Sequence, residues 1–385
     1  MDTKHLSYKQ KTNLGSFYTP PHLVRLVYDT FAKSKGLVDV VLEPACGYGA
    51  FFSEKFPQKK VRFIGADIDP MALTIARKKI PNIEFKKINV LSQISRSKFG
   101  IGENEKLAIV GNPPYNDVTS RVKNDIKAKP CKIDEEIKTR DLGLSFMLAF
   151  AKLKPDYIAV LHPLSYLIKK TNFETLKPLM QNYKLLEAIV FNSQEFSETS
   201  KTNGFPIVAA VYAKSEQGTS YEQIVKRKFK TLEKQEFSIS DFDYICKYIS
   251  KYPSRHSKAD DFKFFTMRDI NALKRSRTFI EEDTANTIYI PQEKLPYYCY
   301  VDIFKDIANK LPYYFGNLDV PFDKNNFEKL KDDFFALSIA KHPDIFAGKY
   351  SIPNQERINF AKTKVQTYFN NLFNAHLLLA QTQFI

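Results

Sequence analysis

The chain has 385 residues, of which 43% are hydrophobic, 26% charged and 14% aromatic. This apolar fraction excludes a wholly disordered chain, and the length predicts about two domains. The four cysteines are too far apart to form a CxxC pair, so we expect neither a metal site nor a disulfide framework.

The charge is positive and unevenly distributed. The chain has 58 Lys and Arg against 43 Asp and Glu, which gives a net charge of +15. Residues 1–100 carry 17 basic and 8 acidic side chains, residues 201–277 carry 16 and 9, and residues 278–385 carry 11 and 13. Two basic segments favour a polyanionic partner, although an ordinary lysine-rich surface would give the same counts. The sequence has no apolar run of ~18 residues and no signal peptide, so we expect a cytoplasmic protein without membrane contact.

The first half of the chain predicts alternating strands and helices. Apolar runs typical of buried parallel strands lie at 38–42, 61–66, 83–88, 107–110, 157–161, 185–191 and 207–213. Helical patterns lie between them at 21–33, 48–56, 71–79, 142–152 and 173–182. This alternation predicts an α/β fold, a doubly wound and mainly parallel seven-stranded sheet formed by residues 1–215.

The alternation stops near Lys214, where the polar sequence SEQGTS follows. Beyond it, helical patterns at 224–233 and 267–275 are mixed with Tyr- and Pro-rich sequences such as LPYYCYVDIF. We therefore expect residues 216–385 to form a second, smaller α+β domain.

A glycine-containing turn follows the first predicted strand, in the sequence VVLEPACGYGAF. Gly47 and Gly49 let the backbone approach a ligand closely, and doubly wound sheets bind cofactors in the crevice beyond the strand ends. The sequence is not a dinucleotide fingerprint, because the position of the third glycine is Phe52.

Two acidic residues follow the second predicted strand, in FIGADIDP. Asp67 ends that strand, where a carboxylate can accept hydrogen bonds from both hydroxyls of a ribose. A solvated loop acid is the alternative interpretation. Asp69 precedes Pro70 and is expected to cap the next helix.

The sequence IVGNPPYND, residues 109–117, is the most specific motif. Its two prolines fix an extended, rigid turn that presents the Asn112 amide and the Pro113 carbonyl. Those two oxygens can accept both hydrogens of a planar amino group while the Tyr115 ring stacks on the parent ring. Methyl transfer to a conjugated amino group requires such acceptors, because its nitrogen lone pair is delocalised and must be freed.

With these motifs the sequence resembles the S-adenosylmethionine-dependent DNA adenine-N6 methyltransferases, in the gamma-type motif order of restriction–modification systems. That group has a Gly-x-Phe/Tyr-x-Thr-Pro signature, then a cofactor turn, then Asn-Pro-Pro-Tyr and a target-recognition region. The chain has GSFYTP at 15–20, EPACGYG at 43–49 and NPPY at 112–115, followed by an unmatched basic region from about 216. The resemblance covers roughly residues 13–215.

The resemblance implies S-adenosyl-L-methionine as cofactor and assigns roles to individual residues. Asn112, Pro113, Pro114 and Tyr115 would be catalytic, and Phe173 would stack on the other face of an extruded adenine, although an ordinary helix-core phenylalanine is as good an interpretation. Asp67 would hold the ribose, and Asn89 would take the place of the aspartate that usually accepts the adenine amino group. The full set of cofactor-binding positions is Tyr18, Thr19, Pro20, Glu43, Cys46, Gly47, Gly49, Asp67, Ile68, Asn89, Val90 and Asn112.

The resemblance also implies duplex DNA as the partner, with a separate cognate restriction endonuclease possible, and a flipped target base. Candidate DNA contacts, mostly to phosphate, are Arg255, Lys258, Lys263, Arg268, Lys274, Arg275 and Arg277. Residues 116–140 form either a flap over DNA or a solvated connection. His162 is expected to be a structural histidine.

Other activities remain as alternatives. RNA adenine is one substrate and the glutamine side chain of a release factor is another, because its amide is also planar and conjugated. Cytosine-C5 chemistry needs a Pro-Cys nucleophile, and Pro130-Cys131 lies away from the NPPY turn. Cytosine-N4 enzymes usually carry Ser or Asp where Asn112 stands. A non-catalytic DNA-binding protein is the alternative of a different class.

Overall fold

The computed structural model describes residues 19–115, 132–196, 204–254 and 261–373. The chain divides into two units, Met1–Ser238 and Ile239–Ile385. In the described residues, no helix is both long enough and apolar enough to cross a membrane.

The first unit is built on a nine-stranded sheet with the order β3-β2-β1-β4-β5-β7-β6-β8-β9. Strands β1 to β5 are parallel to one another, whereas β7 runs antiparallel to both β5 and β6. The doubly wound, mainly parallel α/β fold is therefore confirmed. The strands are β1 (Val40–Glu43), β2 (Arg62–Asp67), β3 (Glu84–Lys87), β4 (Leu107–Gly111), β5 (Tyr157–Pro163), β6 (Tyr183–Asn192), β7 (Pro206–Lys214), β8 (Phe229–Thr231) and β9 (Glu236–Phe237).

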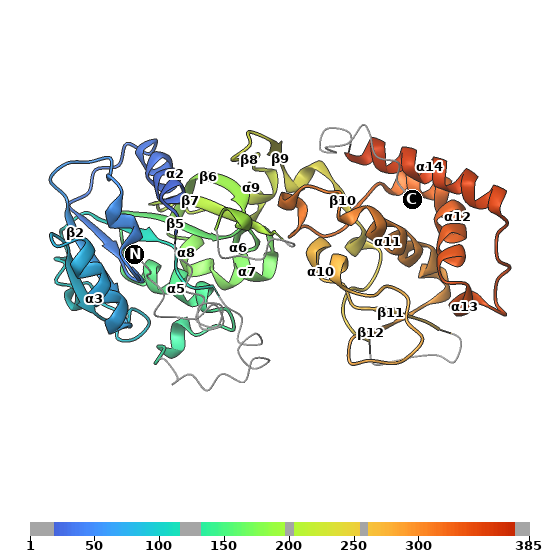
Figure 1. Cartoon of the computed structure of the whole chain (residues 1–385), viewed down its shortest axis with the longest axis horizontal. Helices are drawn as coiled ribbons and strands as arrows, with labels where there is room; N and C mark the ends of the chain where they lie inside the picture. Colours follow the sequence, from blue (N-terminus) through green and yellow to red (C-terminus); the bar gives the residue numbers. More distant parts are fainter. Residues whose placement is uncertain (1–18, 116–131, 197–203, 255–260, 374–385) are drawn as a thin grey trace. The chain divides into compact units, whose positions relative to one another are not determined.

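Helices cover both faces of this sheet, with α2 on one side and α5 and α8 on the other (Figure 1). Helix α2 packs on β5, β6 and β7 over an apolar cluster that includes Val41, Val110 and Leu161. The helices are α2 (Pro21–Ala32), α3 (Pro70–Lys79), α5 (Leu142–Lys152), α6 (Ser165–Ile168), α7 (Lys170–Thr175), α8 (Lys177–Met180) and α9 (Tyr221–Lys226), with 3-10 turns at Ala50–Ser53, Ser97–Phe99, Glu135–Ile137 and Ser193–Glu195.

Local sequence explains where these helices begin. Asp69 caps α3, because its side chain accepts hydrogen bonds from the backbone N–H groups of Met71 and Ala72 at 2.9 and 3.3 Å. Pro70 occupies the first turn, where a missing N–H has no helical partner to lose. The predicted cap is confirmed.

Two predicted helices are wrong in extent. The helix expected at 48–56 is a single 3-10 turn, because Gly47 and Gly49 adopt left-handed backbone before it and Pro57 follows closely. The helix expected at 173–182 breaks into α7 and α8. Pro178 has no N–H to donate, so it occupies the first turn of a new helix rather than the interior of the old one.

Seven strands lie within residues 1–215 as predicted, and in the described residues the sheet continues beyond that boundary with β8 and β9. Residues 216–238 belong to the first unit, where β8 runs parallel to β6 and β9 pairs with β8. Arg227 joins this segment to β6 by donating hydrogen bonds to the Leu185 and Leu186 carbonyls at 3.1 and 2.7 Å. The helix predicted at 224–233 ends at Lys226, because residues 229–231 alternate buried, exposed, buried as a strand does.

The second unit is mainly helical and also contains two ribbons of two strands each. The Tyr- and Pro-rich sequence from Leu295 forms α11, since Pro296 lies in the first turn of that helix. Its elements are α10 (Ile270–Arg275), α11 (Leu295–Ala308), α12 (Lys324–Lys341), α13 (Pro343–Phe346) and α14 (Gln355–Phe373), with the ribbons β10 (Asp243–Tyr244) with β13 (Pro321–Phe322) and β11 (Phe262–Phe265) with β12 (Thr287–Ile290). Short 3-10 turns lie at Ile239–Asp241, Ile245–Lys247, Gln292–Lys294 and Tyr313–Phe315.

Candidate active site

The sheet brings the predicted site residues to one edge. Strand β1 lies between β2 and β4, and all three are parallel. Their carboxyl ends therefore meet at the same edge, where chain order switches direction and open α/β sheets leave a crevice. Glu43 ends β1, Asp67 ends β2, and Asn112 directly follows β4.

The glycine turn leaves its backbone open. Gly47 and Gly49 have φ angles of 49° and 76°, which favour glycine. A Cβ built on Gly47 would meet nothing within 4 Å, whereas one on Gly49 would lie 3.0 Å from Ile80 Cδ1. The Gly47 backbone therefore faces space that a ligand can enter, while Gly49 permits close packing against α3. Cys46 is buried beside them, and burial raises the pKa of its thiol.

Asp67 holds this turn in place. Its Oδ2 accepts a hydrogen bond from the Gly47 N–H at 2.8 Å, and its Oδ1 accepts one from the Asp69 N–H at 2.9 Å. Burial raises the pKa of Asp67, and these backbone donors act in the opposite direction. Each carboxylate oxygen keeps further lone-pair capacity for a ribose hydroxyl.

Three further predicted cofactor-binding positions, Ile68, Asn89 and Val90, have different surroundings. Ile68 is 52% exposed, an uncovered apolar surface next to Asp67, whereas Val90 is buried. The Asn89 Oδ1 accepts a hydrogen bond from the Leu91 N–H at 3.0 Å, and its Nδ2 donates to the Lys132 carbonyl at 2.7 Å. The amide of Asn89 thus anchors local backbone, and its contact with adenine stays a prediction.

Glu43 is a buried carboxyl group with an unused oxygen. The residue is 3% exposed, and its Oε2 has no hydrogen-bond partner among the described residues. Burial raises the pKa of Glu43 well above its usual range, and the neighbouring Asp67 raises it further.

Asn112 is held in one orientation by the segment before α2. Its Nδ2 donates a hydrogen bond to Thr19 Oγ1 at 3.2 Å, and Thr19 is itself buried. The Asn112 Oδ1 is buried and has no partner in the described part of the chain. Pro20, which follows Thr19, is the N-cap residue of α2. Tyr18 lies outside the described residues.

Tyr115 packs at the rim of the apolar cluster under α2, with Pro113 buried and Pro114 half-buried before it. A Cβ on Gly143 would lie 2.8 Å from Tyr115 Cβ and 2.3 Å from the Tyr166 hydroxyl. Glycine therefore lets the start of α5 approach both rings. Burial raises the pKa of the Tyr115 hydroxyl, so this ring stays neutral.

Phe173 offers little ring surface. It is 6% exposed and contacts the Tyr221 ring edge-on, with the ring centroids 5.3 Å apart. Its stacking on a base stays a prediction. Phe205 was missed by the sequence analysis, although it is half-buried and packs on the same apolar cluster as Tyr115. Its position two residues before the predicted strand at 207–213 is the signal that could have found it.

His162 is a structural histidine, as predicted. It is buried, and its Nε2 shares a hydrogen bond of 2.7 Å with the Tyr212 hydroxyl. Burial lowers the pKa of His162 to about 4, so the ring is neutral near pH 7. Its other face stacks on Tyr166, whose hydroxyl donates to Asp141 Oδ1 at 2.6 Å. The sequence analysis did not predict this Tyr166–Asp141 hydrogen bond. Tyr166 and Tyr115 both lie beside Gly143 at the start of α5, so the bond helps to fix the surroundings of Tyr115.

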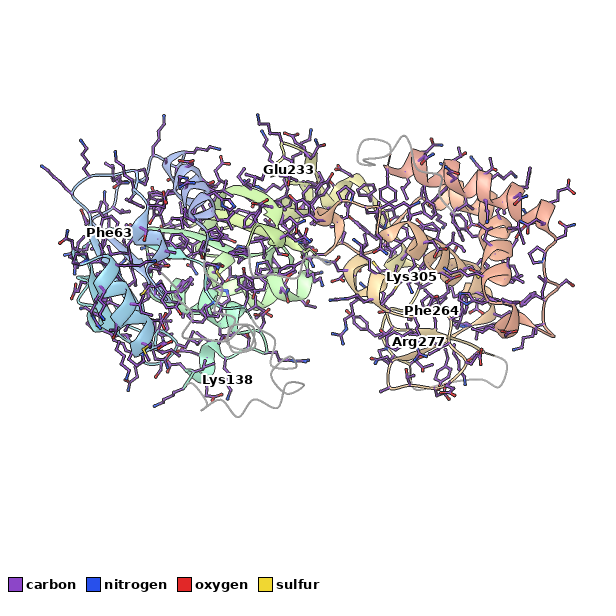
Figure 2. The ribbon with its side chains drawn as sticks, in the orientation of Figure 1. Phe63, Lys138, Glu233, Phe264, Arg277 and Lys305 are labelled. Atoms are coloured by element: carbon purple, nitrogen blue, oxygen red, sulfur yellow. The ribbon has the colours of Figure 1, made fainter. Side chains whose placement is uncertain are left out.

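The predicted DNA contacts of the second unit have different surroundings. Arg268, Arg275 and Arg277 are exposed, and Arg277 lies over the Phe265 ring at 6.0 Å, beside the β11–β12 ribbon (Figure 2). Lys263 forms an ion pair of 3.2 Å with Asp283, and burial lowers the pKa of Lys274. Arg255, Lys258 and Cys131 lie outside the described residues, as do residues 116–131 of the predicted flap.

The site fits a ligand with a positive charge and hydrogen-bond donors. Glu43 and Asn112 each contribute a buried oxygen that has no hydrogen-bond partner among the described residues, and Gly47 leaves room above the turn. In the part of the chain that the structure describes, no group of three or more His, Cys, Asp or Glu side chains could hold a metal ion.

Comparisons with known proteins place this geometry in context. The N-6 DNA methylase family matches residues 4–270, more than two thirds of the chain. Similar solved structures include a SAM-dependent methyltransferase from Anabaena variabilis (17% identity, 54% of this chain and 92% of that chain, TM-score 0.32). They also include the N-methyltransferase NodS from Bradyrhizobium japonicum in complex with S-adenosyl-L-homocysteine (15% identity, 51% of this chain and 86% of that chain, TM-score 0.31). A third is the 23S rRNA methyltransferase ErmE (15% identity, 54% of this chain and 75% of that chain, TM-score 0.31). No curated protein matches the sequence.

Proposed function

Because the chain belongs to the N-6 DNA methylase family, we propose that it transfers a methyl group from S-adenosyl-L-methionine to the N6 amino group of adenine in duplex DNA. The observation that carries this proposal is the Asn112 amide, whose Oδ1 is buried and has no partner in the described segments while its Nδ2 donates to Thr19. An oxygen that is desolvated, fixed and unused is suited to accept a hydrogen bond from a substrate amino group.

The cofactor supplies a methyl group on a positively charged sulfonium. Asn112 Oδ1 and the Pro113 carbonyl accept the two hydrogens of the adenine amino group, which draws the nitrogen lone pair out of conjugation. Tyr115 stacks on the base and keeps the nitrogen in position. The proton leaves the product nitrogen for water after transfer, so the site needs no general base.

The adenine must leave the helix, because its amino group is paired in duplex DNA. Stacking on Tyr115 supplies ~1–3 kcal/mol, which offsets an unstacking cost of a few kcal/mol. Phe205 is better exposed than Phe173 for the opposite face of the base, and it packs on the same cluster as Tyr115. Both remain candidates for that role.

The second unit is proposed to recognise the target sequence. Arg268 and Arg275 are exposed and form no ion pair with another described residue, so both side chains can reach phosphate. In this interpretation the protein is the modification enzyme of a type II restriction–modification system. It acts in the cytoplasm, beside a separate nuclease.

The deciding experiment offers one labelled cofactor to several substrates. The protein is incubated with methyl-labelled S-adenosyl-L-methionine and with duplex DNA, structured RNA or a release factor, and the products are digested and analysed by mass. N6-methyladenine from duplex DNA is the expected product. N6-methyladenine from RNA alone, N4-methylcytosine or methylglutamine would each contradict the proposed substrate, and a protein that binds DNA but labels nothing would contradict the proposed activity.

A further inference from the structure

Glu43 has an unusual environment for a carboxyl group. It is buried at the end of β1, and its Oε2 has no partner among the described residues. A Cβ on Gly111 would lie 3.5 Å from Glu43 Cγ, so the end of β4 closes over one side of it. An ionised carboxylate there would have one oxygen without water and without a hydrogen-bond donor among the described residues, which makes the charged form costly.

The titratable groups that face Glu43 do not relieve this cost. Among the described residues they are Asp67 from β2, Cys46 from the glycine turn and Tyr28 from α2. All three are acids, and Asp67 adds repulsion when it is ionised. Arg77 of α3 lowers the pKa of the Cys46 thiol, and its guanidinium donates a hydrogen bond to the Phe85 carbonyl. Burial first, and Asp67 second, raise the pKa of Glu43.

The strand order places Glu43 between two residues of the proposed site. Strand β1 lies between β2, where Asp67 is the proposed ribose ligand, and β4, where Asn112 is the proposed amine acceptor. A cofactor held by Asp67 with its methyl group directed at an amine on Asn112 would pass the end of β1. This placement rests on the proposed function of those two residues.

We propose that Glu43 holds a proton in the empty protein and releases it when the cationic cofactor binds, so that the buried carboxylate becomes the counter-ion of the sulfonium. Only the O–H bond of Glu43 breaks, and its proton goes to the solvent. The site thereby exchanges a neutral acid for an ion pair. S-adenosyl-L-homocysteine has a neutral thioether, so it lacks the sulfonium charge that would stabilise the ionised form of Glu43.

Two consequences follow from this exchange. Affinity for S-adenosyl-L-methionine rises with pH, by up to about tenfold per pH unit while the free protein is protonated and the complex is ionised. Affinity for S-adenosyl-L-homocysteine does not rise in this way. After methyl transfer the sulfonium charge is gone, and the buried carboxylate loses its counter-ion. Reprotonation of Glu43 then favours product release.

The test is calorimetric and needs no nucleic acid. The full-length protein is titrated at pH 7 in phosphate and in Tris buffer, and the dependence of the enthalpy on buffer ionisation gives the number of protons released. We expect S-adenosyl-L-methionine to release up to about one proton more than S-adenosyl-L-homocysteine does, and sinefungin, which carries an amine in place of the methylated sulfur, to release more than the thioether as well. Equal proton release for the first two ligands would overturn the proposal, even if the protein proves to methylate DNA.

Two variants test whether the released proton comes from Glu43. Glu43→Gln keeps the shape of the side chain but cannot ionise, so its extra proton release on S-adenosyl-L-methionine should disappear. The pH dependence of its preference over the thioether should disappear with it. The ligand's own amino group titrates equally in both proteins and cancels in the comparison. Glu54→Gln is the matched control, since Glu54 pairs with the exposed Arg25, and it should behave as the unaltered protein does. Undiminished proton release in Glu43→Gln would show that another group is the source.

Discussion

The Asn112 Nδ2 donates a hydrogen bond to Thr19, whereas the Asn112 Oδ1 has no partner among the described residues. The role of each atom can be tested by a separate substitution. In Asn112→Ala the acceptor for the amino group is lost, while the glycine turn and Asp67 keep their contacts. We expect kcat to fall by at least ~10²-fold, as for loss of one preorganised polar group in an active site. Calorimetry should find cofactor affinity nearly unchanged. A variant that methylates DNA at the original rate would remove Asn112 from the mechanism.

Thr19 tests whether the orientation of that amide matters. Thr19→Val keeps the size of the side chain but removes the oxygen that accepts from Asn112 Nδ2. Loss of one such hydrogen bond is worth about 1 kcal/mol, so we expect kcat to fall about fivefold with little change in KM for DNA. Thr19→Ser retains the hydroxyl and should restore the rate. If Thr19→Ser reduces kcat as much as Thr19→Val does, the hydroxyl alone does not sustain the rate, and the hydrogen bond from Asn112 does not explain the effect of valine.

The two glycines of the turn between β1 and the 3-10 turn Ala50–Ser53 make a matched pair. Both have positive φ, so alanine at either costs about 1 kcal/mol of backbone strain. Gly47→Ala adds its methyl group to open space at the ligand side and should weaken cofactor binding strongly with a small loss of stability. Gly49→Ala forces a contact of 3.0 Å with Ile80 and should lower the melting temperature more. Thermal unfolding gives the melting temperature of each variant, and calorimetry gives its affinity for the cofactor. If Gly49→Ala weakens cofactor binding more than Gly47→Ala does, the ligand lies on the other side of the turn.

The strands around this turn were predictable because each is a short buried run that ends in a residue with distinctive chemistry. Glu43, Asp67 and Asn112 follow such runs, and parallel pairing brings the three ends together. The sequence could not indicate β8 and β9, since strands of three and two residues carry no periodic signal. The sequence does contain signals for the break at Pro178 and for the short turn after Gly49, namely the proline and the two glycines themselves. The helical periodicity of the surrounding apolar residues hides both signals.

The candidate site was less predictable wherever it depends on packing between distant elements. The NPPY and TP motifs indicated Asn112 and Thr19, which prove to share a hydrogen bond across 93 positions. Nothing local in the sequence shows that Phe173 packs on Tyr221, that Asn89 binds the Lys132 carbonyl, or that Tyr166 and Asp141 support the region behind Tyr115. These contacts join residues that are brought together only by the completed fold.

For the molecule as a whole, the positive charge predicts a salt-dependent interaction with DNA. Arg268 and Arg275 are exposed on the second unit and form no ion pair with another described residue. Each phosphate contact contributes about 0.9 to the slope of log K against log salt, so Arg268→Ala combined with Arg275→Ala should reduce that slope by about two. Weakening should be similar on all sequences, because phosphate carries no sequence information.

The matched control for this double variant is Lys329→Ala with Lys331→Ala, which removes two exposed cations from α12 of the same unit. Filter binding or fluorescence anisotropy over a range of salt concentrations measures both variants. An equal change of slope in the two would mean that the arginines act only through net charge.

The unpartnered Glu43 also has a practical consequence for handling the protein. Folding raises the pKa of the Glu43 carboxyl group. Its contribution to the free energy of unfolding is therefore fully present at a pH below the pKa of the unfolded state, and it is lost as the pH rises through the pKa of the folded state. Purification that strips the ligand should therefore succeed best in mildly acidic buffer, and alkaline storage should shorten the lifetime of the empty enzyme. Adding S-adenosyl-L-methionine before concentration or crystallisation should remove that sensitivity, and scanning calorimetry of both preparations between pH 6 and 9 would reveal it as two melting curves that diverge toward the alkaline end.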